Sequence, residues 1–218
     1  RQGYAAAQAT CYAAEGQLSL APVAAWLRSD VLRTVLASLP NLWVSEAARL
    51  MPELLLEHPA LPRPAPISEY GGRLRFFEAL ARIVVATARP LLLFIDDIQW
   101  CDQETLDWLH VLMRFARQSQ LLVVAAVRDE ELSPAHPMQT LRIHLQHEGS
   151  ITELPLLPLD AAESAQLAAL IAGKQLDDRS ALRLFQHTEG NPLFIVETMR
   201  AGEVLTGANI ASDEADAP

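Results

Sequence analysis

Residues 91–97 read LLLFIDD, a run of apolar side chains that ends in two aspartates, and this stretch decides the fold class. An uninterrupted apolar run of this length is typical of a parallel strand that is buried on both faces. A second buried strand is expected at residues 121–127, and a third at residues 151–154 after a helix over residues 134–148. Strands that alternate with helices predict a parallel sheet with right-handed crossovers, which is an α/β fold.

The chain before this stretch is expected to supply one more strand and three helices. Residues 4–12 are alanine-rich and bounded by glycines, which favours a short strand. Helical periodicity covers residues 21–39 and 42–56, and a further helix is expected over residues 68–89, capped by its first residue, a serine. Four prolines within residues 58–66 exclude the interior of a helix or sheet, so this segment is predicted to be an exposed connector.

Short helices with strong start signals follow in the last quarter of the chain. Asp160 opens a capping box before an Ala/Leu-rich helix. Asp177 or Asp178 is expected to cap a second helix, and Asn191 followed by Pro192 marks the start of a third.

These signals predict an organisation in three parts. A partial α/β core occupies residues 1–155, and a small helical domain occupies residues 156–201. Residues 202–218 are acidic and free of aromatic side chains, so they are expected to form a disordered tail or linker.

Composition and charge exclude several classes of protein. The net charge of −10 opposes direct contact with nucleic acid, because phosphates repel an acidic surface. No apolar run approaches the ~20 residues that a membrane span needs, and the first residues show no signal-peptide pattern. Cys11 and Cys101 lie far apart in the sequence and have no metal-ligand spacing. A cytoplasmic protein without membrane or direct nucleic-acid contact is therefore expected.

The two aspartates that end the first quoted strand carry the candidate chemistry. In open parallel sheets, ligands bind outside the carboxyl ends of the strands, where Asp96 and Asp97 are expected. Mg²⁺ takes hard oxygen ligands, often one carboxylate with phosphate oxygens, and a second carboxylate can orient or deprotonate a water that attacks a phosphate. The alternative is a strand that ends in a polar turn, with Asp97 or Asp102 capping the next helix. The apolar-then-acidic pattern alone does not decide between the two.

Residues 94–102, FIDDIQWCD, resemble a known family. The aspartate pair, glutamine, tryptophan and final aspartate are similar to the Walker B stretch of the AAA-like ATPase modules in STAND-class signal-transduction ATPases, which occur in large bacterial LuxR-type regulators. Cys101 stands where the family usually has alanine. The resemblance covers roughly residues 4–200, and further segments that carry it follow in the family's order: residues 9–22, 123–132, 156–159 and 188–194.

This resemblance implies a P-loop NTPase-type parallel sheet flanked by helices, followed by a small helical lid. It implies that Asp96 helps to hold Mg²⁺ and that Asp97, as a catalytic residue, polarises the attacking water. Arg128 would sense the γ-phosphate of ATP and stabilise charge in the transition state. In the lid, Gly190 belongs to a Gly-x-Pro motif, and Pro192 would lie against the adenine.

Several of these residues also have simpler interpretations. Arg128 alone indicates a surface ion pair with Asp129 or Glu130. Trp100 packs beneath the site or serves as an ordinary core aromatic, and the core is favoured. Asp102 is most simply a helix cap, and the proline of the Gly-x-Pro motif a helix start. Histidines without metal spacing are expected at the surface: His136, His144 and His147.

The phosphate-binding loop of this class, Gly-x-x-x-x-Gly-Lys followed by Ser or Thr, does not occur in the sequence. Its one Gly-Lys pair is Gly173-Lys174, which Gln175 follows, and Ala168 occupies the first glycine position. The resemblance implies that this loop and the first strand lie upstream of Arg1. The sheet is then expected to be incomplete, with an open edge, and the fragment alone is not expected to hydrolyse ATP.

The favoured hypothesis is an ATP-binding signalling switch from a bacterial transcriptional regulator or a related protein. Its partners would be ATP and ADP with Mg²⁺, an attached effector domain and further copies of itself, and turnover in the parent protein would be slow. The alternative is a non-catalytic scaffold that binds proteins through a degenerate NTPase fold. A hydrolase that uses the paired carboxylates on another substrate is disfavoured, since no Ser–His or Cys–His signature accompanies them.

Overall fold

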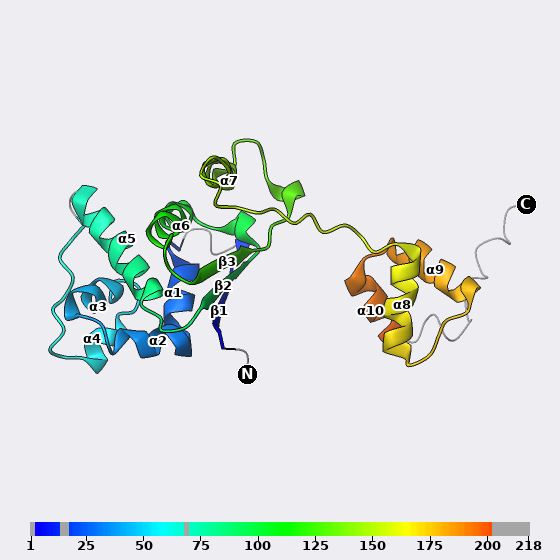
Figure 1. Cartoon of the computed structure of the whole chain (residues 1–218), viewed down its shortest axis with the longest axis horizontal. Coiled ribbons are helices and arrows are strands. Elements are labelled where there is room, and N and C mark those ends of the chain that lie inside the picture. Colours follow the sequence, from blue (N-terminus) through cyan, green and yellow to red (C-terminus); the bar gives the residue numbers. More distant parts are fainter. Residues whose placement is uncertain (1–2, 14–17, 68–69, 202–218) are drawn as a thin grey trace, which may run out of the picture. The chain divides into compact units, whose positions relative to one another are not determined.

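A computed structural model describes residues 3–13, 18–67 and 70–201 of this chain. The chain divides into two compact units, Arg1–Thr152 and Glu153–Pro218, and each is treated by itself below (Figure 1). The tail expected at residues 202–218 and the serine cap expected at Ser68 lie outside the described residues.

The first unit is built on a parallel sheet of β1 (Ala5–Thr10), β2 (Leu91–Asp96) and β3 (Leu121–Ala125), in the order β1-β2-β3. The strands start level with one another, since Ala5 pairs with Leu91 and Leu91 with Leu121. Helices flank this sheet (Figure 1), so the predicted α/β class with a parallel sheet is confirmed. Because the strands are parallel and in register, their carboxyl ends meet at one edge.

The helices of the first unit are shorter and more numerous than the periodicity predicts. Their bounds are α1 (Ala21–Arg28), α2 (Asp30–Leu36), α3 (Asn41–Ala47), α4 (Glu53–Glu57), α5 (Tyr70–Val85), α6 (Gln103–Phe115) and α7 (Pro137–His147). The single helix expected over residues 21–39 is wrong, because Ser29 is extended and its hydroxyl caps α2 by accepting the Leu32 N–H. The helix expected over residues 42–56 is interrupted before Pro52, which disfavours a helical residue ahead of it.

The core lies against one face of the sheet. Alternate residues of β1 and β2 are buried there: Ala5, Ala7, Ala9, Leu91, Leu93 and Ile95. Trp26 and Trp108 have no exposed surface, and each also satisfies its indole N–H. Trp26 Nε1 donates to the Phe94 carbonyl at 3.0 Å and Trp108 Nε1 to the Phe77 carbonyl at 3.2 Å. These bonds fix α1 on β2 and α6 on α5.

The predictions for β3 and the strand after it need correction. Residues 121–127 were expected to be buried on both faces, but Leu122 is 60% and Val124 39% exposed. The strand expected at residues 151–154 is wrong, since no helix or strand forms between residues 151 and 160. A strand requires a neighbour to hydrogen-bond with, and among the described residues β3 pairs with β2 alone.

The second unit contains α8 (Ala161–Ala172), α9 (Asp178–Thr188) and α10 (Pro192–Ala201) around a small core of Ala168, Leu184, Ile195 and Met199. The start signals are all used as expected. Asp160 and Glu163 form the capping box, and Asp177 caps α9. The Asn191 side chain accepts the Leu193 N–H at 3.0 Å.

No helix in the described ranges combines the length and the apolar character required to cross a membrane.

Candidate functional site

Two carboxylates stand side by side where β2 ends. Asp96 is the last residue of the strand, pairs with Thr10 of β1, and accepts the Cys11 N–H on its carbonyl at 3.0 Å. Asp97 has φ 53° and ψ 46°, a left-handed backbone that aspartate tolerates better than most residues. Both residues are half-buried. The strand end therefore holds the carboxylates at the sheet's carboxyl edge, as the sequence predicts.

Arg128, just beyond β3, reaches the second carboxylate. Its Nε lies 3.3 Å from Asp97 Oδ1, and its Nη1 lies 4.0 Å from Glu131 Oε1. The partner is therefore not Asp129 or Glu130, which were the simple alternatives. Because the Arg128 side chain is 57% exposed, solvent screens this pair and it adds little stability. A positive charge nevertheless stands beside the paired carboxylates.

Gln99, the glutamine of the stretch that resembles the known family, is a member of the site to which sequence reasoning gave no role. It is only 3% exposed, and its amide joins the ends of both strands. Its Nε2 donates to Asp97 Oδ1 at 3.0 Å and to Glu131 Oε2 at 3.4 Å. Its Oε1 accepts the Arg128 N–H at 3.3 Å. A buried amide with each polar atom bonded fixes its neighbours, so Gln99 positions Asp97 relative to Arg128.

His136 was expected at the surface, but it is half-buried and bonded to this cluster. Its Nδ1 accepts the Met138 N–H at 3.1 Å, which leaves the proton on Nε2. Nε2 then donates to the Gln99 carbonyl at 2.9 Å. His136 thus caps α7 and ties that helix to the site. Its place directly before Pro137, the first residue of α7, was the available sequence signal.

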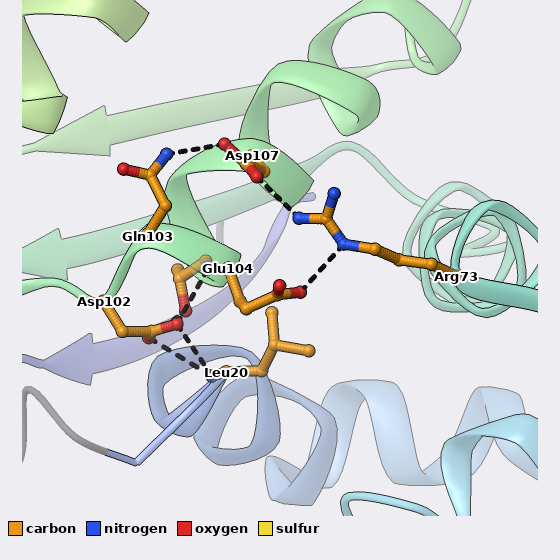
Figure 2. A network of polar contacts seen from close by, with 7 residues as sticks. Leu20, Arg73, Asp102, Gln103, Glu104 and Asp107 are labelled. Carbon is orange, nitrogen blue, oxygen red and sulfur yellow. Dashed lines mark hydrogen bonds and ion pairs between the residues drawn. The ribbon is translucent and has the colours of Figure 1, made fainter. Parts of the chain in front are cut away.

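The segment that follows is held by Asp102, the expected cap of α6. Its carboxylate accepts the Thr105 N–H at 3.0 Å and also the Leu20 N–H at 3.2 Å, so it joins the start of α1 to α6 (Figure 2). Arg73 of α5 forms ion pairs with two carboxylates of α6, Glu104 at 3.1 Å and Asp107 at 2.5 Å (Figure 2). The chain on both sides of the site is therefore fixed to the surrounding helices.

Two thiols that are far apart in the sequence meet beside this segment. The Cys11 and Cys101 side chains hydrogen-bond to each other. This bond lowers the pKa of Cys11, although burial and the nearby Asp102, Asp97 and Asp96 act to raise it. The same bond, followed by burial, raises the pKa of Cys101 far above its ordinary value. The spacing of the two cysteines does not predict this contact, because the contact depends on the pairing of β1 with β2.

Residues 1–124 match the model of a protein family described as an AAA ATPase domain. The chain belongs to this family. Membership indicates a nucleotide-binding, ATPase-type function, and AAA ATPase domains generally use ATP and Mg²⁺. No curated protein and no solved structure matches the chain.

The matched part of this AAA ATPase domain contains the two aspartates but stops before Arg128. Asp96 Oδ1 accepts the Asp97 N–H at 3.1 Å, and no described side chain forms an ion pair with the Asp96 carboxylate. No group of three or more His, Cys, Asp or Glu side chains in the described residues could hold a metal by itself. These residues fit Mg²⁺ that arrives with phosphate, because that ion needs only one or two carboxylates when phosphate and water supply the other ligands.

Gly190 and Pro192 belong to the second unit, where the structure gives each a structural role. Gly190 has φ +76°, and a Cβ there would lie 2.0 Å from the Leu159 carbonyl oxygen. Its own carbonyl accepts the Leu159 N–H at 2.9 Å. Pro192 is the first residue of α10 and is exposed, next to the exposed Leu193 and Phe194. The helix-start interpretation of Pro192 is therefore confirmed.

Proposed function

We propose that this AAA ATPase domain is the nucleotide-responsive part of a signalling switch of the STAND class, as found in bacterial transcriptional regulators. The observation that carries the proposal is the pair Asp96 and Asp97 at the carboxyl edge of the sheet, with Arg128 bonded to Asp97 at 3.3 Å. Two carboxylates and one guanidinium are among the groups that act on a Mg²⁺-bound triphosphate.

Asp96, Asp97 and Arg128 would each have a separate role in this site. Asp96 would take the magnesium ion, because its carboxylate has no cationic partner among the described residues. Asp97 would orient the water that attacks the γ-phosphate, through the carboxylate oxygen not already bonded to Arg128 and Gln99. Arg128 would turn from Asp97 toward the γ-phosphate, since a more highly charged anion competes for its guanidinium.

The second unit, residues 156–201 in the predicted organisation, is proposed to act as the lid. Pro192, Leu193 and Phe194 are exposed at the start of α10 and offer an apolar surface on which a nucleobase could pack. Gly190 would serve by setting the backbone turn ahead of them. Changes in an attached effector domain, and self-association, would be the outputs of the switch.

A second candidate is a protein-binding scaffold without turnover. The exposed apolar surface on β3 and just beyond it favours this scaffold. There Leu122 is 60%, Val124 39% and Val127 40% exposed. The sequence also lacks a glycine-rich phosphate loop, so we expect residues 1–218 alone not to hydrolyse ATP.

Calorimetric titration with MgATP distinguishes the two candidates. We expect no binding by residues 1–218, and binding by a chain extended upstream through a glycine-rich loop. In the extended chain, Asp96→Ala should weaken binding in the presence of Mg²⁺ and have little effect in EDTA. Asp178→Ala, an exposed carboxylate in the second unit, is the matched control and should change neither. A folded extended chain that ignores ATP would refute the nucleotide switch and favour the scaffold.

A further inference from the structure

The fold brings the chain's two cysteines to one place, next to the carboxylates but outside the chemistry assigned to them. Cys11 follows β1 directly, and its N–H continues the ladder to the Asp96 carbonyl. Cys101 follows the 3-10 turn Ile98–Trp100, and its N–H donates to the Ile98 carbonyl at 3.0 Å. The turn folds the chain back, so both side chains line one small pocket.

The backbone that carries the two thiols is held in place. Both cysteines line the same small pocket, together with Thr10, Trp100 and Asp102. Cys11 is held by the strand ladder, and Cys101 by its neighbour Asp102, whose carboxylate is bonded to Leu20 and Thr105 (Figure 2). A rigid frame favours disulfide formation, because cysteines can bridge without backbone movement only when they already lie close together.

We propose that Cys11 and Cys101 form a reversible intramolecular disulfide, a modification site that links the carboxyl ends of β1 and β2. This inference does not depend on the proposed nucleotide switch. The position of this disulfide has a consequence for the site. It would link Cys11, whose N–H donates to the Asp96 carbonyl, to the segment that leads into α6.

The oxidant would be a low-molecular-weight disulfide. One cysteine of the pair, as its thiolate, attacks one sulfur of the small disulfide, breaks that S–S bond and releases one small thiol, which takes up the proton lost by the attacking cysteine. The other cysteine then attacks the protein sulfur of the mixed disulfide and releases the second small thiol, which takes up the proton from that second cysteine. Both cysteines are oxidised and the small disulfide is reduced to two thiols.

The test uses the whole chain in a glutathione redox buffer. After acid quenching, we expect the intact mass to fall by two hydrogen atoms, no free thiol to remain, and peptide mapping to link Cys11 to Cys101. Dithiothreitol should restore both thiols. Because the chain has only two cysteines, an intramolecular disulfide has one possible assignment.

A comparison between native and urea-unfolded protein shows whether the fold favours the bond. The equilibrium constant for disulfide formation against glutathione should be at least roughly tenfold larger in native buffer, because the fold raises the effective concentration of one thiol near the other. Matched variants define the steps. In Cys11→Ser and in Cys101→Ser, the remaining cysteine should stop as the glutathione adduct, because no second thiol is present to displace the glutathione.

Three results would overturn the proposal: glutathione adducts on both cysteines that persist in native protein, disulfide-linked dimers in place of the intramolecular bond, or equal constants in native buffer and urea.

Discussion

Asp102 offers the sharpest test of how the site is held in place, because one carboxylate serves three donors. It accepts the N–H of Thr105 at 3.0 Å, the hydroxyl of Thr105 at 2.5 Å and the N–H of Leu20 at 3.2 Å. Asp102→Ala removes the α6 cap, which costs about 1 kcal/mol. It also leaves the Leu20 N–H and the Thr105 hydroxyl without an acceptor. Each costs about 1–3 kcal/mol, because Leu20 is 3% and Thr105 0% exposed. Because neighbouring effects are not additive, we expect a total loss of about 3–5 kcal/mol.

Urea unfolding followed by tryptophan fluorescence measures this loss. All four tryptophans, Trp26, Trp43, Trp100 and Trp108, lie in the first unit, so the signal reports on that unit. With a urea dependence of about 2 kcal/mol per molar, the transition midpoint should fall by about 1.5–2.5 M.

Two control variants separate the cap from the other bonds. Asp102→Asn keeps an acceptor at the cap but loses charge, so it should cost about 1–2 kcal/mol. Asp107→Ala removes a carboxylate of α6 that is 38% exposed and paired with Arg73, and it should cost less than about 1 kcal/mol. The reasoning fails if Asp102→Ala unfolds within about 0.5 kcal/mol of the parent chain.

Three further perturbations test other parts of the structure. Gly190→Ala forces a left-handed alanine and a 2.0 Å contact with a carbonyl oxygen, so it should destabilise the second unit by about 3 kcal/mol; hydrogen exchange in α8–α10 no faster than in the parent would contradict this. Trp26→Phe leaves the Phe94 carbonyl without its indole donor and should cost about 2–3 kcal/mol in urea unfolding, whereas an unchanged midpoint would mean that this bond is dispensable. The pKa of Asp177 is lowered below its ordinary 3.8 by bonds from Ser180, so its carboxylate stabilises α9 fully above pH 3.8 and loses this effect as the pH falls through the lowered value. Circular dichroism should therefore show that acid sensitivity of the second unit diminishes in Asp177→Ala, and an unchanged acid transition would refute the assignment.

Local signals in the sequence predicted the local features of the structure well. The 91–95 run became β2, and aspartates 102, 160 and 177 cap the helices that they precede. These predictions succeed because a cap or a buried strand is decided by residues within one or two turns. Asp96 and Asp97 were singled out as candidates by the apolar run before them and by the resemblance, and Arg128 by the resemblance alone. The structure places Arg128 beside Asp97.

Features that depend on distant neighbours were missed. Neighbouring segments decide whether Leu122 on β3 is exposed and whether residues 151–154 form a strand. An apolar run in the sequence does not show which segments lie alongside the sheet. The resemblance includes Gln99 but gives it no role, because that role depends on the alignment of β2 with β3, whose ends its amide spans. The contact between the two cysteines likewise follows from strand register.

The left-handed backbone of Asp97 has a consequence for the range of residues that can replace it. At φ 53° and ψ 46°, glycine, asparagine and aspartate are tolerated, while a longer or branched side chain adds strain. Glutamate fits this backbone less readily than aspartate, although Glu189 adopts φ 50° at the end of α9. The turn of the main chain therefore favours a short side chain at this position, and Asp97→Asn, which keeps the turn, is the substitution that isolates the charge.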